Sequence, residues 1–227
     1  MCFSFRTSLF SYSIAIASAI FAFCTRQIVL GALILAYAQI QLSEMMIWYG
    51  IDNNDKSWNR FGTNFGKYML ATHNIAVGIG LILAIMYVAK RPLRKVDFLP
   101  LVAGLLLFLG VAIFVYPNVN SADVTYPRAQ TCNKCQSPEN RLQWPYPQSW
   151  YLISYALSMA VLYFWIKPSS TRTVLMVIFT LTLVLSFLIY PKTVGSVWCW
   201  SASFIAPALV LINYMLIKDK PSGSILS

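Results

Sequence analysis

Residues 27–50 read QIVLGALILAYAQIQLSEMMIWYG, and this stretch decides the fold class. It contains a single charged residue, Glu44, among mostly apolar side chains. An α-helix of about 20 apolar residues is long enough to cross the roughly 30 Å hydrocarbon core of a bilayer. The sequence therefore predicts that this segment is a membrane-spanning helix.

The composition of the whole chain agrees with that prediction. Of its 227 residues, 58% are hydrophobic and 11% are charged, and a soluble fold of that size could not bury so much apolar surface. The net charge of +10 does not indicate a nucleic-acid partner, because the 17 Lys and Arg residues lie in short polar breaks between apolar runs. Membrane proteins place cations in this way beside anionic lipid headgroups. We therefore expect the lipid bilayer as a partner and exclude a soluble enzyme, a nucleic-acid reader and a disordered chain.

We expect an all-α fold: a polytopic membrane protein whose seven transmembrane helices form a bundle within a single domain, residues 1–227. The predicted helices are approximately 8–24, 27–50, 67–89, 98–117, 149–166, 173–190 and 197–217. The first is a retained helix rather than a signal peptide, because Cys24-Thr25-Arg26 is a poor cleavage site. The two long connections, 51–66 and 118–148, then lie on one side of the membrane. The second of them is a long extramembrane loop with a Cys-x-x-Cys pair.

The distribution of Lys and Arg sets the expected orientation. Lys90, Arg91, Arg94 and Lys95 fall in one short connection, on the side opposite the N-terminus. Short loops rich in Lys and Arg remain in the cytosol. The N-terminus is therefore predicted outside or in a lumen, and the C-terminus in the cytosol.

Glu44 is the only acid within a predicted span, and His73 is the only histidine in the chain. Each lies about six residues, roughly 9 Å, from the outer end of its predicted helix, so the two are expected at the same depth on antiparallel neighbours. A carboxylate at the bilayer centre costs about 2.5–3.5 kcal/mol on insertion scales and is normally paired or faces a cavity. We therefore predict a polar site in the outer half of the bundle, with Glu44 and His73 in contact. Further lining residues are expected to be Gln41, Asn74 and Gln39.

Glu–His pairs serve proton relay, cation coordination and acid–base chemistry. The alternative is a polar contact that only fixes how the helices pack. Both interpretations remain open from the sequence.

The cysteines offer two further predictions. Four of them are expected on the outer side: Cys2, Cys132, Cys135 and Cys199. An even outer set permits disulfides, and the simplest joins Cys132 to Cys135. Alternatively, Cys2 and Cys199 could join Glu44 and His73 as ligands of a transition-metal ion. A Cys₂His₂ zinc site is excluded within one chain, because that site needs two histidines.

The same residues exclude several familiar cofactors. Retinal proteins need a lysine inside the last helix, and residues 197–217 contain none. A haem with two histidine ligands needs a second histidine. No phosphate-binding loop and no dinucleotide fingerprint occur in the chain. We therefore expect no retinal and no haem.

Three short motifs carry a resemblance to a known family. They are Met1-Cys2-Phe3-Ser4, Gln41-Leu42-Ser43-Glu44 followed by Trp48, and Trp198-Cys199. In these the chain resembles a family of uncharacterised bacterial and viral multi-pass membrane proteins that open Met-Cys-Phe-Ser or Met-Cys-Trp-Ser. The resemblance spans the whole chain. It implies that Cys2, Gln41, Glu44 and Cys199 belong to one site, without implying an activity.

Three functions remain open at this level. The first is non-enzymatic transport or binding, in which a small cation, a metal ion or a small molecule engages Glu44 and His73 from the outer side. The second is an intramembrane enzyme acting on lipid, with Glu44 and His73 as an acid–base couple and Cys199 as the nucleophile. The third is a structural or envelope protein that binds a partner through the 118–148 loop. We favour the first.

Overall fold

The computed structural model describes residues 4–114, 116–118, 124–127, 142–145, 163–166, 169–189 and 193–218. The described part of the chain is mostly α-helical, with one small β-hairpin. Its helices are α1 (Phe5–Cys24), α2 (Ile28–Asp52), α3 (Lys56–Met69), α4 (His73–Ala84), α5 (Leu99–Phe114), α8 (Ser169–Ile189) and α9 (Val194–Ile217). Four short helical turns accompany them: η1 (Ile85–Ala89), η2 (Lys95–Phe98), η3 (Tyr116–Asn118) and η4 (Tyr163–Trp165). The hairpin pairs β1 (Tyr126–Pro127) with β2 (Leu142–Gln143) in antiparallel fashion.

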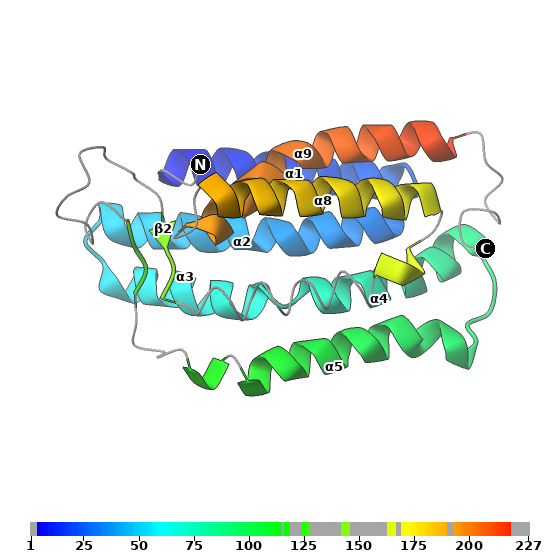
Figure 1. Cartoon of the computed structure of the whole chain (residues 1–227), viewed down its shortest axis with the longest axis horizontal. Helices are drawn as coiled ribbons and strands as arrows, with labels where there is room; N and C mark the ends of the chain where they lie inside the picture. The colour runs from blue at the N-terminus through cyan, green and yellow to red at the C-terminus, as the bar shows by residue number, and fades with distance from the viewer. Residues whose placement is uncertain are drawn as a thin grey trace.

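The helices lie side by side along the long axis of the molecule, which gives the bundle two ends (Figure 1). We call one the hairpin end: it holds the start of α1, the α2–α3 turn at 53–55 and the β1–β2 hairpin. We call the other the basic end: it holds the α1–α2 turn at 25–27, the connection 90–94 and the end of α9. The fifth predicted helix, 149–166, lies outside the described residues except for Tyr163–Ile166.

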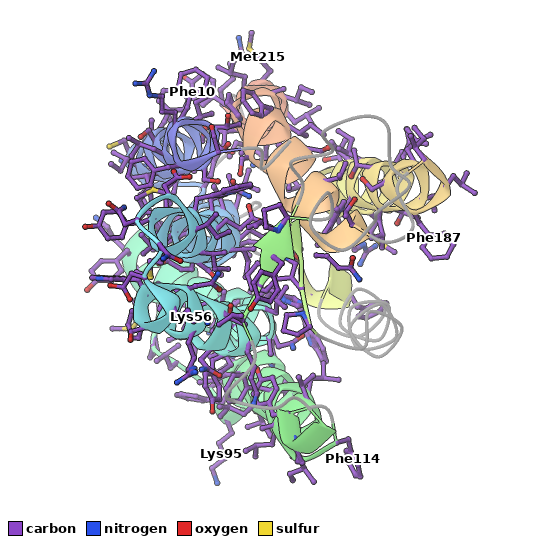
Figure 2. The ribbon with its side chains drawn as sticks, turned by 90° about the vertical axis from the view of Figure 1, so that its left-hand side faces the viewer. Phe10, Lys56, Lys95, Phe114, Phe187 and Met215 are labelled. Carbon is purple, nitrogen blue, oxygen red and sulfur yellow. The ribbon has the colours of Figure 1, made fainter. Side chains whose placement is uncertain are left out.

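Helix α2 forms the centre of the bundle. It packs against α1, α3, α4 and α9, whereas α5 packs mainly against α4. Just over half of the apolar stretch of α2 is buried (56%), against 17% for α5 and for α8. Viewed along the bundle, α1, α2, α3 and α5 form a curved row, and α8 and α9 lie to one side of it (Figure 2). Polar groups on the buried faces of α2 are therefore the best shielded in the described part of the chain.

The serines of α1 suit a helix that packs closely on others. Its buried positions are all small: Ser8, Ser11, Ala15, Ser18, Ala19 and Ala22. Ser11 Oγ donates to the carbonyl of Thr7, and Ser18 Oγ donates to that of Ile14. Both hydroxyls therefore have hydrogen-bond partners within α1. The small side chains on this face let α2 and α9 pack closely against α1.

The sequence predicts residues 51–66 as a connection between spans, but most of this segment is helical, because α3 begins at Lys56. Asp55 caps α3: its Oδ1 accepts from the backbone N–H of Ser57 (2.8 Å) and of Trp58 (3.2 Å). Gly62 and Gly66 then bring α3 against α2. A Cβ on Gly62 would lie 2.9 Å from side-chain and backbone atoms of Ile47. This helix is polar on one side, so it lacks the continuous apolar run on which the prediction of spans relied.

Four described helices are long and apolar enough to cross a membrane. They are α1, α2, α8 and the segment Lys95–Phe114, which consists of η2 and α5. The pair α3 and α4, with η1, is bent by 56° at the break between Met69 and His73 and counts as a fifth if it is one broken span. The outer surface is apolar to match: Phe10, Phe114, Phe187 and Met215 all point outward (Figure 2). These features are those of a membrane-embedded helical protein.

Candidate functional site

One buried face of α2 carries a line of polar and aromatic side chains. Tyr37, Gln41, Glu44 and Trp48 follow one another at steps of three or four residues, which places them on the same side of the helix. Gln41 and Glu44 are fully buried. Glu44 is therefore a shielded carboxyl on the most buried of the long helices.

His73 and Asn74 lie at the start of α4 and are also buried. His73 Nδ1 lies 2.8 Å from the carbonyl oxygen of Leu70. Its ring stacks on Tyr37, with the ring centroids 5.4 Å apart and the planes 12° from parallel. Tyr37 also contacts Phe179 of α8 and Trp198 of α9. His73 thus belongs to an aromatic cluster that joins four helices.

The prediction that Glu44 and His73 share one depth needs correction. The stacking on Tyr37 places His73 two helical turns from Glu44, roughly 10 Å along α2. The reason is the early start of α3: the chain enters the bundle at Lys56 rather than near residue 67, so His73 lies deeper. A Glu44–His73 contact is not among those described for either residue.

The structure instead brings Lys67 to the level of Glu44. Ser43 Oγ donates to the carbonyl of Gly62 (2.6 Å), and a Cβ on Gly66 would lie 2.5 Å from the same Oγ. This register sets the turn that carries Lys67 beside the turn that carries Glu44. Lys67 is only 5% exposed. A buried acid and a buried base therefore lie at one depth on neighbouring helices.

Aromatic rings surround the ammonium group of Lys67. Its Nζ lies 5.3 Å from the ring centroid of Tyr116 and 5.7 Å from that of Tyr68, within the range of cation–π attraction. Burial raises the pKa of Tyr116 above its ordinary value. Its hydroxyl therefore stays protonated at neutral pH and donates to the carbonyl of Tyr68 (3.3 Å). We call these buried polar residues of α2, α3 and α4 the ionisable group, after its titratable members Glu44, Lys67 and His73. The amides of Gln41 and Asn74 complete the group.

The sequence analysis did not single out Lys67, because this residue was predicted to begin the third span, 67–89. The signal that could have found it is the stripe Asn59, Thr63 and Lys67, four residues apart, interleaved with Gly62 and Gly66. Polar side chains at that spacing form one helix face, and the glycines show that a neighbour approaches it closely.

The β1–β2 hairpin is bonded to α3 within about two turns of Lys67. Asn59 Nδ2 donates to the carbonyl of Thr125 (2.8 Å), and the backbone N–H of Thr125 donates to Asn59 Oδ1 (2.9 Å). The hydroxyls of Thr63 and Thr125 lie 2.8 Å apart. The ring of Trp144 would lie 2.6 Å from a Cβ on Gly66, so it packs on the turn before Lys67. The hairpin therefore lies over the hairpin-end half of α3.

The remaining predicted residues lie elsewhere or outside the description. Gln39 does not line the same site, because it projects from nearly the opposite side of α2 from Gln41, where Gln39 Nε2 donates to the carbonyl of Leu35 (3.1 Å). Cys2 and the predicted disulfide pair Cys132–Cys135 lie outside the described residues, as does the side chain of Cys199.

The metal site with Cys2 and Cys199 stays a prediction. Within the described ranges, no three His, Cys, Asp or Glu side chains come together as a metal site would require. Cys24 is an exposed free thiol on α1, one residue before the α1–α2 turn.

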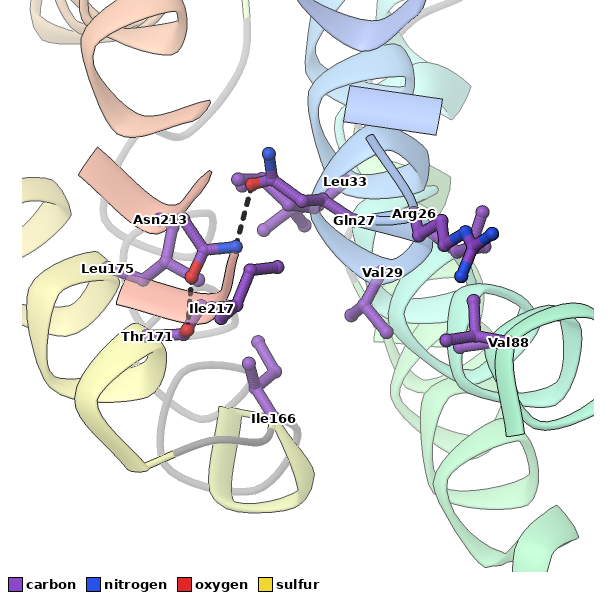
Figure 3. A pocket seen from close by; sticks show the side chains of 13 residues that line it. Arg26, Gln27, Val29, Leu33, Val88, Ile166, Thr171, Leu175, Asn213 and Ile217 are labelled. Carbon is purple, nitrogen blue, oxygen red and sulfur yellow. Dashed lines mark hydrogen bonds between the residues drawn. The ribbon is translucent and has the colours of Figure 1, made fainter. Parts of the chain in front are cut away.

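A second buried polar group, which the sequence analysis did not predict, lies at the basic end. Asn213 Nδ2 donates to Gln27 Oε1 (2.7 Å), and Thr171 Oγ1 donates to Asn213 Oδ1 (Figure 3). Gln27 Nε2 donates to the carbonyl of Val210 (3.2 Å). We call Gln27, Thr171 and Asn213 the amide triad. The pocket beside it measures about 30 Å³, room for roughly two water molecules.

Comparison of the chain with protein families, with curated proteins and with solved structures finds no match in any of the three.

Proposed function

We propose that this protein is a seven-span integral membrane protein that binds a small cation, a proton included, at Glu44, and that it serves in transport or cation binding. The hairpin end faces the outside or a lumen in this proposal, and the basic end faces the cytosol. The dense cations of the basic end support the orientation: Arg26, Lys90, Arg91, Arg94 and Lys95 all lie there.

The complete burial of Glu44 carries the proposal. Removing a carboxylate from water is expensive, and acids within membrane spans are therefore rare and mark ion or proton pathways. Glu44 also lies in a line with Gln41, whose amide can offer a neutral ligand oxygen to a cation. A packing contact between helices could be made by neutral amides, as the amide triad shows, and would not need a carboxyl group.

Lys67 and His73 give the site its further chemistry. Lys67 is a buried positive charge at the depth of Glu44, so the pair keeps the site close to neutral when no cation is bound. His73 adds a second titratable side chain two turns deeper.

The test compares Glu44→Gln with Asp52→Asn. Both changes convert an acid of α2 into its amide, but Glu44 is buried and Asp52 is exposed. Purified protein is reconstituted into liposomes, and uptake of H⁺, Na⁺ and K⁺ is followed together with the melting temperature at increasing concentrations of each ion. We expect Glu44→Gln to abolish ion-dependent flux or stabilisation and Asp52→Asn to retain it. Wild-type behaviour of Glu44→Gln toward every responding ion, or no response of the wild type to any of them, would contradict the proposal.

A further inference from the structure

A long apolar groove runs along the outside of the bundle between α2 and the bent pair α3–α4. Its volume is about 590 Å³, within the range of roughly 300–1,000 Å³ that small-molecule sites occupy. Two features open it: the 56° bend between α3 and α4, and the small side chains Ala32, Ala36 and Ala76 along its walls.

The surface of this groove offers almost no polar contact. Among its described lining residues, Gln39 and Thr72 alone are polar. Gln39 donates to the carbonyl of Leu35, and Thr72 Oγ1 donates to that of Met69 (2.7 Å), so each already donates to a nearby backbone carbonyl. A ligand that fills the groove must therefore be apolar along this length.

The basic end of the groove has the opposite character. Phe23 and Leu83 line that end. Arg26 follows Phe23 within one turn and lines, with Val88 of η1, the pocket beside the amide triad (Figure 3), and Lys90 follows directly after η1. Both cations are exposed. Both also adopt left-handed backbone conformations, with φ values of 62° and 49°.

No described acid is left over to balance these two charges. Asp97, the acid described at the basic end, accepts from both terminal nitrogens of the Arg91 guanidinium at 2.7 Å and also lies 3.9 Å from Arg94 Nε. Arg26 and Lys90 therefore present positive charge at the same end of the bundle as Phe23 and Leu83, which line the basic end of the groove. A ligand that complements both parts has an anionic head and an apolar chain.

We propose that this groove is a binding site for one anionic phospholipid. The acyl chain lies along α2 and α4 between the alanines, and the phosphate is held by Arg26 and Lys90. Basic pockets between helices on the cytoplasmic side of a membrane bind anionic headgroups for the same electrostatic reason. The site is separate from Glu44, so either proposal can fail without the other.

The test measures which lipid stays with the full-length protein. Wild type is reconstituted into vesicles of equal parts phosphatidylglycerol and phosphatidylcholine, extracted gently, and its bound lipid is counted by native mass spectrometry. We expect about one retained phosphatidylglycerol per chain. The double variant Arg26→Asn, Lys90→Asn removes both charges, and asparagine tolerates the left-handed backbone. The preference for phosphatidylglycerol should fall roughly thirtyfold.

Three control variants and one competition experiment decide the interpretation. Lys56→Gln with Arg60→Gln removes two exposed cations from the hairpin end and should leave lipid retention unchanged. Ala36→Phe fills the groove and should reduce retention of both lipids, whereas millimolar glycerol phosphate should not compete. Glu44→Gln should retain the lipid. Wild-type lipid retention by the Arg26/Lys90 variant would overturn the proposal. An equal loss of lipid in the Lys56/Arg60 variant would also overturn it, because net charge alone would then attract the lipid.

Discussion

Two of the buried polar groups in the described part of the bundle, the amide triad and the ionisable group, differ in kind. In the amide triad, Asn213 Nδ2 pairs with Gln27 Oε1, Asn213 Oδ1 pairs with Thr171, and Gln27 Nε2 pairs with a backbone carbonyl. None of its members titrates. The ionisable group instead contains Glu44, Lys67 and His73, each of which changes charge on gaining or losing a proton.

The difference separates a structural role from a functional one. Neutral amides and hydroxyls that bond one another hold helices together at modest cost. The triad links Gln27, the residue before α2, to Thr171 in the first turn of α8 and to Asn213 near the end of α9, and so fixes how α9 joins the bundle. Buried ionisable groups cost more and are seldom needed for packing alone. We therefore assign stability mainly to the triad and chemistry to the ionisable group.

The largest effect on stability is expected at Gly104, which brings α5 against the ionisable group. A Cβ at this position would collide with the backbone oxygen of Asn74, and backbone atoms cannot move aside as a flexible side chain can. We expect Gly104→Ala to lower the free energy of unfolding by about 3 kcal/mol. Gly110→Ala on the same helix is the control, because nothing lies within 4 Å of its Cβ. Thermal unfolding in detergent measures both, and equal stabilities would contradict the packing described here.

Breaking the amide triad should have the next largest effect. Asn213→Leu leaves Gln27 Oε1 and the hydroxyl of Thr171 buried without their described partner. Each such group costs roughly 1–3 kcal/mol, so we expect a loss of about 2–3 kcal/mol with no loss of ion response. Chemical unfolding combined with the ion-dependent melting assay measures this. Loss of the ion response at unchanged stability would reverse the roles that we assign to the two groups.

A smaller and local effect is expected where the hairpin is fastened. Asn59→Ala removes both hydrogen bonds to Thr125 and should cost about 1–2 kcal/mol. Amide hydrogen exchange should accelerate at 124–127 while exchange in α2 stays unchanged. Asn53→Ala is the control, since Asn53 Nδ2 bonds only the carbonyl of Tyr49 on its own helix among the contacts described. Unchanged protection at Thr125 in the Asn59 variant would show that the hairpin is held by other contacts.

Gln39→Leu should have the smallest effect. The side chain faces the apolar groove rather than Glu44, and its described bond is to its own helix. We expect a change in stability within about 0.5 kcal/mol and an unchanged ion response. A lost ion response would return Gln39 to the site that the sequence had predicted for it.

The sequence predicted the elements that depend on local pattern. Long apolar runs located α1, α2, α5, α8 and α9 to within a few residues, because one bilayer thickness corresponds to one helix length. The same reasoning singled out Glu44, since a lone acid in an apolar run is visible without any structure. Its burial on the central helix agrees with that choice, although the binding role itself stays a proposal.

What depends on contacts between distant segments could not be predicted in this way. The depth of His73 depends on where α3 begins, and α3 is amphipathic, so a search for apolar runs passed over it. The amide triad joins Gln27 to Asn213, 186 residues later, and no local pattern relates the two. The groove lies beside a bend of 56° between α3 and α4, and no Gly or Pro at the break, residues 70–72, marks that bend in the sequence.

The central claim, that chemistry and stability lie in different buried polar groups, is tested most directly by one assay on two variants. The melting temperature of wild type, Glu44→Gln and Asn213→Leu is measured with and without the ion to which the wild type responds. We predict that Glu44→Gln keeps the ion-free melting temperature and loses the ion-dependent rise, whereas Asn213→Leu melts lower and keeps the rise. The opposite pattern, or loss of the rise in both variants, would contradict the account.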